Sequence, residues 1–311
     1  MIKNKILVVC DQSYFEYYVL FGAVNMFMKR KPDEAKTLIK APEDTDQSNL
    51  PDLLVSSTFR KILKEMTMKR CEVLDWVLKQ NFQDEFDMAD QVDIVFAQDD
   101  RVSKSFRKDI YPEYKLQRAF APKSFKTQPI KEYINNVIFK DLDVEEKYGY
   151  RFVKVDGAEG DDVIATIMKS LDGYMLKILF ASDKDFLQID GIKQFDLSGK
   201  EVVRKWGDEV LSAHDFLMMK ILLGDVSDNI PKVFDKVGPK KALRLIHDNT
   251  ALKAKLKENQ ASAKQFKMNK QLICFSEIPK ELKDRILEKV NEKVFTLKQE
   301  KDIDLAEFMT L

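Results

Sequence analysis

Short runs of apolar and β-branched residues recur along the first part of the chain, with helical patterns such as DVIATIMKSL between them. The runs are KILVVC (5–10), VDIVFA (92–97), RFVKV (151–155) and KILFA (177–181). Apolar runs that alternate with helices are typical of parallel strands covered by helices on both faces. The pattern therefore predicts an α/β fold with a mostly parallel central sheet flanked by helices.

From about residue 205 the apolar positions follow a helical period, in LSAHDFLMMKILLG, PKKALRLIHD, KQFKMNKQLICF and PKELKDRILEKV. We therefore expect an α/β domain over residues 1–207, followed over residues 208–311 by a helical module and the C-terminal region. Residues 29–52 are polar and contain three prolines, so we expect a surface excursion with some helix there.

Composition excludes several classes of site. Three scattered cysteines show no disulfide or zinc spacing, and two isolated histidines give no histidine-based metal site. Any metal must then be held by oxygen. The 52 Lys and Arg residues balance the 52 Asp and Glu residues, so basic surfaces have to come from local segregation of charge. The first apolar run is too short to span a bilayer, so we expect a cytoplasmic protein that is not inserted in a membrane.

Acidic residues follow every predicted strand. The residues concerned are Asp11, Asp99, Asp100, Glu159, Asp161, Asp162, Asp183 and Asp185. One acidic strand end is ordinarily a turn or a helix cap. Four of them in one α/β sheet favour a shared crevice, because ligands bind beyond the carboxyl ends of the strands.

Carboxylates without histidine or thiolate suit Mg²⁺ or Mn²⁺, and more carboxylates than one ion needs indicate two ions. Two ions ~3.5 to 4 Å apart can activate water and stabilise the leaving oxygen of a phosphodiester. The stretch SDKDFLQIDG (182–191) is not a calcium loop, because Leu187 stands where an oxygen ligand is required. Asp225 and Asp228, three residues apart, form a second acidic pair, for which capping of the helix end at Gly224 is the alternative.

Two basic segments complement the acidic residues. Residues 101–129 contain eight Lys or Arg against two acids, interleaved with aromatic residues, as single-stranded nucleic acid binding requires. A solvated helix face is the alternative. The segment NIPKVFDKVGPKKALRLI (229–246) places lysines at a helix N-terminus, where they can contact phosphate. A purely structural helix-turn-helix is the alternative there.

In this order, the motifs resemble those of the 5′ nuclease family. The motifs are ILVVCDQS, FRKDIYPEYKLQR, GAEGDD, ASDKDFLQ, GDVSDNIPKVFDKVGPKKA and NKQLICFSEIP. The family comprises flap endonucleases and 5′-3′ exonucleases, and the chain is most similar to phage 5′ exonucleases of the RNase H type. The resemblance implies a PIN-like nuclease domain with a basic arch at about residues 101–129, and a C-terminal helix-three-turn-helix that grips duplex DNA.

The resemblance also implies roles for individual residues. Two Mg²⁺ or Mn²⁺ ions would be held by Asp11, Asp99 or Asp100, Glu159, Asp161, Asp162, Asp183, Asp185 and Asp228, with Asp225 just behind. Lys115 and Arg118 match the arch positions that meet the scissile phosphate. The expected DNA contacts are Arg107, Lys108, Lys123, Lys232, Lys236, Lys240 and Lys241. The turn that binds K⁺ in this family is KVFDKVG here, one residue longer and without two glycines.

The implied activity is metal-dependent hydrolysis near the 5′ end of flap DNA or RNA/DNA primers during replication. Expected partners are branched or nicked DNA, RNA/DNA hybrid, and single-stranded DNA-binding protein or other replication proteins. We expect a monomer. If the protein is phage-encoded, as the likeness to phage enzymes implies, its compartment is the cytoplasm of the host. A noncatalytic nucleic-acid binder of the same fold is the alternative, although carboxylates that repel phosphate bring such a binder no benefit. Within enzymes, a toxin-type RNA nuclease is disfavoured by the helical module.

Overall fold

The structure is a computed structural model that describes residues 4–39, 50–100, 104–117, 127–207 and 209–292. Its central sheet has five strands in the order β3-β2-β1-β4-β5, and every neighbouring pair is parallel. The strands are β1 (Lys5–Asp11), β2 (Gln91–Gln98), β3 (Tyr150–Lys154), β4 (Leu176–Phe180) and β5 (Lys193–Phe195). The predicted parallel α/β sheet is confirmed. The sequence missed β5, whose three residues KQF carry no apolar run.

Strand β1 lies at the centre of the sheet and faces a hydrophobic core on each side. Ile6 and Val8 belong to one buried cluster, whereas Leu7 and Val9 belong to another. Successive side chains of a strand point to opposite faces, so a continuous apolar run is what a strand covered on both sides requires.

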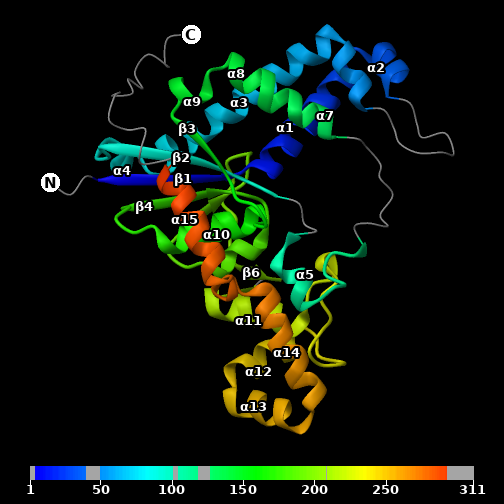
Figure 1. Ribbon diagram of the computed structural model, residues 1–311, viewed down its shortest axis with the longest axis vertical. Coiled ribbons are helices and arrows are strands. Elements are labelled where there is room, and N and C mark those ends of the chain that lie inside the picture. Colours follow the sequence, from blue (N-terminus) through cyan, green and yellow to red (C-terminus); the bar gives the residue numbers. More distant parts are fainter. Residues whose placement is uncertain (1–3, 40–49, 101–103, 118–126, 208, 293–311) are drawn as a thin grey trace.

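The first face of the sheet is covered by helices from the N-terminal half of the chain (Figure 1). The long ones begin at side-chain caps: Asp11 accepts a hydrogen bond from the Tyr14 amide, and Ser56 accepts one from the Phe59 amide. The elements of this region are α1 (Gln12–Arg30), α2 (Pro32–Leu38), η1 (Leu50–Val55), α3 (Ser57–Asn81), α4 (Gln83–Asp87), α7 (Gln128–Tyr133), η3 (Ile134–Ile138), α8 (Phe139–Asp141) and α9 (Val144–Lys147). Helix α2 is the helix expected in the polar excursion, and residues 40–49 of that excursion lie outside the described ranges.

The second face is covered by α10 (Gly160–Ser170) and α15 (Lys280–Val290), which lie side by side in Figure 1. Leu282 and Ile286 of α15 share one buried cluster with Val163 of α10. The last described helix therefore packs against the sheet domain, although it follows the helical module in the sequence. A domain boundary near residue 207 stays a prediction.

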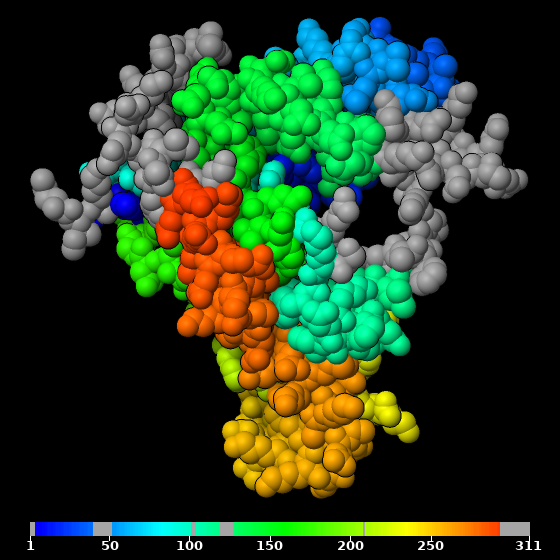
Figure 2. All heavy atoms as spheres, viewed as in Figure 1, coloured from blue at the N-terminus to red at the C-terminus, as the bar shows by residue number. Residues whose placement is uncertain are grey.

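The molecule narrows toward its lower part (Figure 2), and this part is helical (Figure 1). Its elements are α11 (Ala213–Leu223), η5 (Val226–Asp228), α12 (Pro239–His247), α13 (Asn249–Glu258), α14 (Gln260–Ile273) and η6 (Phe275–Glu277). Phe216 of α11, Ala242 of α12 and Leu252 of α13 share a third buried cluster. Between the two parts lie α5 (Phe106–Ile110), η4 (Lys184–Gln188) and a hairpin of β6 (Lys205–Trp206) with β7 (Glu209–Val210).

Gly224 connects α11 to the second acidic pair. Its φ is +66°, and a Cβ atom there would lie 2.3 Å from the Ile230 carbonyl oxygen. Only glycine fits this approach, which lets Asp225 pair with Ile230 in an antiparallel bridge. Among the residues described, no helix combines the length and apolarity that crossing a membrane demands.

Candidate active site

Four carboxylates come together beyond the ends of β1, β2 and β4. Asp11 ends β1 and caps α1, while Asp99 follows β2 and accepts hydrogen bonds from the Ser13 hydroxyl (2.7 Å) and the Gly160 amide (2.6 Å). Asp161 stands in the first turn of α10, and Asp183 follows β4. The parallel sheet thus delivers these acids to one edge, as the sequence predicts.

Burial and mutual repulsion raise the pKa of two of these carboxylates. Burial, together with the charges of Asp99 and Asp183, raises the pKa of Asp11 to about 7. Burial likewise raises the pKa of Asp161 well above its usual range, and Asp183, Asp11 and Asp99 raise it further. Carboxylates that destabilise one another in this way gain stability from a cation placed among them.

The structure distinguishes Asp99 from Asp100, which the sequence leaves open. Asp100 accepts a hydrogen bond from the Gly157 amide at 3.0 Å, and lies 3.7 Å from the Lys104 ammonium and 3.6 Å from that of Lys154. Asp99, in contrast, acts electrostatically on Asp11 and on the acidic start of α10. Asp99 is therefore the member of the pair that faces the acidic group.

Glu159 and Asp162 have different surroundings although they are three residues apart. They form a capping box at the start of α10, in which the Asp162 carboxylate accepts a hydrogen bond from the Glu159 amide at 3.1 Å. Asp162 is fully buried and forms an ion pair with Arg107 at 2.8 Å. Asp162 is thus engaged in a structural ion pair, which differs from the expected role as a metal ligand.

Arg107 also differs from its expected role as a DNA contact. Its side chain is 4% exposed, and it donates a hydrogen bond to the Leu272 carbonyl oxygen at 2.8 Å besides pairing with Asp162. Burial acts against its charge, but Asp162 and Glu159 raise the pKa of the guanidinium above its usual value. Arg107 therefore joins α5 to α10 and α14 inside the protein, and its guanidinium is occupied by protein acceptors.

Lys115 lies among the acidic residues. Its ammonium pairs with Glu159 and lies 3.9 Å from Asp228 and 4.9 Å from the centre of the Tyr114 ring. Burial opposes the charged form, but Glu159 and Asp228 raise the pKa of Lys115. Conversely, burial acts to raise the pKa of Glu159, whereas Lys115 and Arg107 lower it below the usual value. Both groups are charged near neutral pH.

A second lysine, Lys220, which the sequence did not single out, lies between Asp185 and Asp225. Its ammonium lies 2.6 Å from Asp185 and also pairs with Asp225. Burial opposes its charge, but these two carboxylates raise the pKa of Lys220 above its usual value. The available signal was a single cation in the otherwise apolar stretch FLMMKILL of α11.

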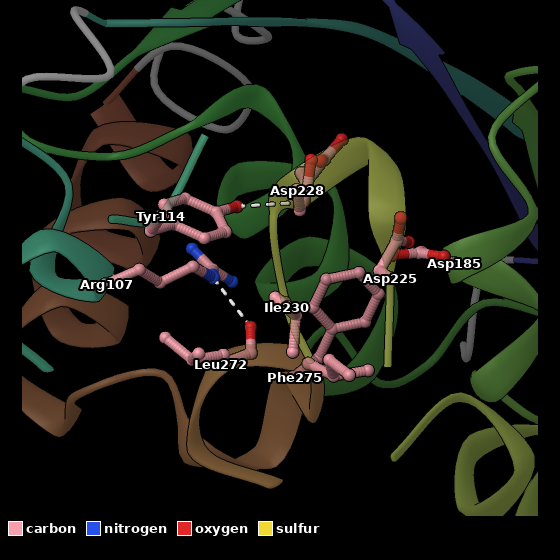
Figure 3. Close-up of a pocket in the computed structure, with 10 residues that line it drawn as sticks. Arg107, Tyr114, Asp185, Asp225, Asp228, Ile230, Leu272 and Phe275 are labelled. Carbon is pink, nitrogen blue, oxygen red and sulfur yellow. Dashed lines mark hydrogen bonds between the residues drawn. The ribbon is translucent and has the colours of Figure 1, made fainter. Parts of the chain in front are cut away.

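A pocket places Asp161 of the acidic sheet edge near the acidic residues around Lys220 and Tyr114 (Figure 3). It is lined by Asp161, Asp185, Asp225 and Asp228, with Tyr114 and Arg107 on another side. The Tyr114 hydroxyl donates to the Asp228 carboxylate at 3.2 Å. Residues from β-strand ends, from the segment after α5 and from the loop after α11 thus meet at one place.

Hard oxygen donors of this kind fit a divalent cation chemically. In the described part of the chain, however, no three His, Cys, Asp or Glu residues are arranged so as to hold an ion as they stand. Lys115 and Lys220 supply positive charge to Glu159, Asp185 and Asp225 instead. Cation binding there requires these two ammonium groups to separate from their carboxylates.

The predicted basic residues of the helical module are exposed. Lys232, Lys236, Lys240 and Lys241 all lie at the surface. A hollow of about 450 Å³ is lined by Asp235, Lys236, Val237, Lys241, Arg244, Leu245 and Lys255. Lys108, in α5, is half-buried and donates to the Pro112 carbonyl oxygen at 3.3 Å. Arg118 and Lys123 lie outside the described residues.

Known proteins share both sequence and fold with this chain. Residues 65–211 match the family model of the 5'-3' exonuclease N-terminal resolvase-like domain. The chain is 32% identical over 159 residues to a 5'-3' exonuclease of Aquifex aeolicus. The matched residues cover 47% of this chain and 50% of that relative. It is 30% identical over 198 residues to a 5'-3' exonuclease of Buchnera aphidicola, at 60% and 63% coverage. A DNA polymerase I of Lactococcus lactis is 32% identical over 191 residues, 56% of this chain.

The chain spans about a fifth of the length of such polymerases and about half or somewhat more of the exonucleases. Among solved structures, a T5 5'-exonuclease with bound divalent metal ions (zinc) has the same fold, with a TM-score of 0.55 at 15% identity over 93% of this chain and 99% of that one. The T5 D15 flap endonuclease in complex with DNA and metal ions gives 0.54 at 14% identity over 92% and 98%. The resemblance to the 5′ nuclease family seen in the motifs is confirmed by the family model over residues 65–211, and the fold is that of the T5 5'-exonuclease.

Proposed function

We propose that this protein is a divalent-metal-dependent, structure-specific 5′ nuclease that hydrolyses phosphodiesters near the 5′ end of flap DNA or RNA/DNA primers. The observation that carries the proposal is the group of Asp11, Asp99, Asp161 and Asp183, four mutually repelling carboxylates at one edge of the sheet. A fold alone seldom requires such a group, because like charges held close together destabilise one another.

Asp11, Asp99, Asp161 and Asp183 are the residues that would hold one divalent ion. Glu159, Asp185, Asp225 and Asp228 would hold a second once Lys115 and Lys220 separate from their carboxylate partners. Bound Mg²⁺ or Mn²⁺ supplies an activated water and positive charge beside the phosphodiester oxygens. Metal binding in general is supported by the T5 D15 flap endonuclease, which shares the fold and was crystallised with DNA and metal ions.

Lys115 contributes a charge-assisted hydrogen-bond donor at the edge of the pocket. Its ammonium is partnered by Glu159 and Asp228, and both partners favour its charged form. A phosphate that displaces these partners would receive the same donor, and such a donor acts most strongly where negative charge develops. We assign Lys115, with Arg118 beyond the described residues, to the scissile phosphate.

The exposed lysines of the helical module are assigned to the duplex. Lys236 and Lys241 line one hollow, and Lys240 stands beside them at the start of α12. Phosphate contacts of this kind position a nucleic acid without reading its sequence. The altered turn KVFDKVG is a candidate K⁺ site because family members bind K⁺ there. Action as a monomer together with replication proteins completes the proposal.

A noncatalytic nucleic-acid binder of the same fold is the competing function. Labelled 5′ flap DNA and RNA/DNA hybrid should each be incubated with Mg²⁺, with Ca²⁺ and with chelator. We expect cleavage with Mg²⁺ and none with chelator. Binding of the flap without cleavage under all conditions would support the competing function, and full cleavage in chelator would exclude the metal-dependent one.

A further inference from the structure

Two segments from different parts of the chain are joined by hydrogen bonds beside Lys115. Residues 111–117 follow α5, and residues 225–230 form the loop after α11, which we call the acidic loop. The Gln117 amide group donates to the Val226 carbonyl oxygen at 3.0 Å and to that of Ser227 at 2.8 Å. The Asn229 amide group donates in the other direction, to the Glu113 carbonyl oxygen at 2.9 Å.

A backbone hydrogen bond lies between these side-chain contacts. The Lys115 amide donates to the Asp228 carbonyl oxygen at 3.0 Å. With the Tyr114–Asp228 hydrogen bond described above, five hydrogen bonds thus connect residues 113–117 with residues 226–229. The segment after α5 is therefore attached to the acidic loop by polar contacts on both sides of Lys115.

The backbone at Lys115 needs such support. Its φ is +55°, in the left-handed region that a lysine adopts at a cost, whereas Asn229, at +60°, is a residue type that tolerates this region. An unfavourable φ persists only where surrounding contacts fix it. The conformation of Lys115 directs its ammonium toward Glu159 and Asp228, so the contacts that fix the backbone also fix the charge.

We propose that Gln117 and Asn229 are positioning residues that attach residues 111–117 to the acidic loop and thereby place the Lys115 ammonium at the candidate active site. This inference rests on the proposed nuclease function for its kinetic consequence. Its structural consequence, protection of the Lys115 amide, is independent of cleavage. The exposed positions of both side-chain contacts give each an effect smaller than that of Lys115 itself.

The test uses Gln117→Ala and Asn229→Gly in the full chain. Glycine accepts the left-handed φ, so Asn229→Gly removes the amide group without backbone strain. Gln83→Ala is the matched control, because the exposed Gln83 side chain donates to Asp87 within α4 and not to the acidic loop. We expect a single-turnover rate at saturating enzyme about 10-fold lower for each variant, unchanged flap affinity, and a control like wild type.

Two further measurements separate positioning from general damage. In a Lys115→Ala background, neither substitution should lower the rate further, because the positioned group is already gone. Hydrogen–deuterium exchange without DNA should show faster exchange in the peptide that contains Lys115 for both variants. Equal losses in both backgrounds, or unchanged exchange, would overturn the proposal. Absence of cleavage by wild type would instead refute the nuclease function. In that case the hydrogen–deuterium exchange would still test whether Gln117 and Asn229 attach residues 111–117 to the acidic loop.

Discussion

Lysines occur in two contrasting settings in this molecule. At the sheet edge, Lys115 and Lys220 are partly or largely buried and each is paired with two carboxylates. In the helical module, Lys240 and Lys241 are exposed at the start of α12. Burial with opposite charge fixes an ammonium group in space, whereas exposure leaves it available for any nearby phosphate. The same residue type therefore suits precise chemistry in one region and sequence-independent binding in the other.

The largest expected effect lies on the acidic side of this comparison. Asp161→Asn or Asp183→Asn should abolish cleavage while flap affinity stays within roughly 10-fold of wild type, since each change removes a metal ligand and also a charge that repels phosphate. Single-turnover cleavage and equilibrium binding measure the two effects. Asp190→Asn is the control, because Asp190 is highly exposed and pairs only with Arg204 among its described ion pairs. Full cleavage by Asp161→Asn would contradict the assignment.

The sequence predicted the sheet and its acidic edge because both follow from repeating local patterns. Each apolar run ended in acid, and parallel strands bring such ends together irrespective of details elsewhere. The sequence did not distinguish Asp99 from Asp100. Neighbouring side chains at the end of a strand point in different directions, and the conformation of the following turn determines which of them faces the acidic group. Their partners, Gly160 and Gly157, are about sixty residues away in the sequence.

The sequence also gave no means of identifying buried ion pairs. Arg107 lies in a basic segment and was expected on the surface, but its acidic partner Asp162 comes from another element, 55 residues away. Lys220 resembled an isolated polar residue on an apolar helix until tertiary folding brought Asp185 against it. Pairings of this kind depend on three-dimensional proximity, which no local period encodes.

The second prediction concerns the buried lysine of the arch segment. Lys115→Ala should lower the single-turnover rate at saturating enzyme by about 10² to 10³ with little loss of flap affinity, because its donor acts mainly in the transition state. Lys104→Ala is the control from the same segment, since the Lys104 side chain is 55% exposed and lies 3.7 Å from Asp100. A Lys115→Ala variant that turns over like wild type once bound would remove the contrast between buried and exposed lysines.

A third prediction tests, through stability, the raised pKa of Asp11, which burial causes first and the charges of Asp99 and Asp183 increase further. The pKa of Asp11 is raised from 3.8 to about 7 in the folded protein, so the folded state retains a proton that the unfolded state releases between these values. The free energy of unfolding in chelator should therefore fall as pH rises from about 4 to 7, on the order of 1 kcal/mol per pH unit from this group.

Asp11→Asn provides the comparison, because asparagine removes the charge and can still cap α1. Denaturant unfolding at pH 5 and pH 8 in chelator should show a smaller loss of stability for Asp11→Asn than for wild type. Mg²⁺ should stabilise wild type more at pH 8 than at pH 5, since the cation replaces the proton. An identical pH dependence in the two proteins would show that burial and the neighbouring carboxylates do not raise the pKa of Asp11 as the structure indicates.

The smallest expected effect belongs to the exposed lysines. Lys240→Ala with Lys241→Ala should weaken flap binding and lower the slope of log affinity against log salt by at most about two units, because two phosphate contacts release two fewer counterions. The single-turnover rate at saturation should stay near that of wild type, since these residues bind the duplex equally in the ground and transition states.

The matched control is Lys36→Ala with Lys61→Ala, two exposed lysines of α2 and α3 at the opposite end of the molecule (Figure 1). An equal change of salt slope in both double variants would mean that binding responds to net charge and that α12 has no specific role. A lower rate at saturation for the α12 variant would mean that exposed lysines also reach the reacting phosphate, which would refute the division of labour between the two regions.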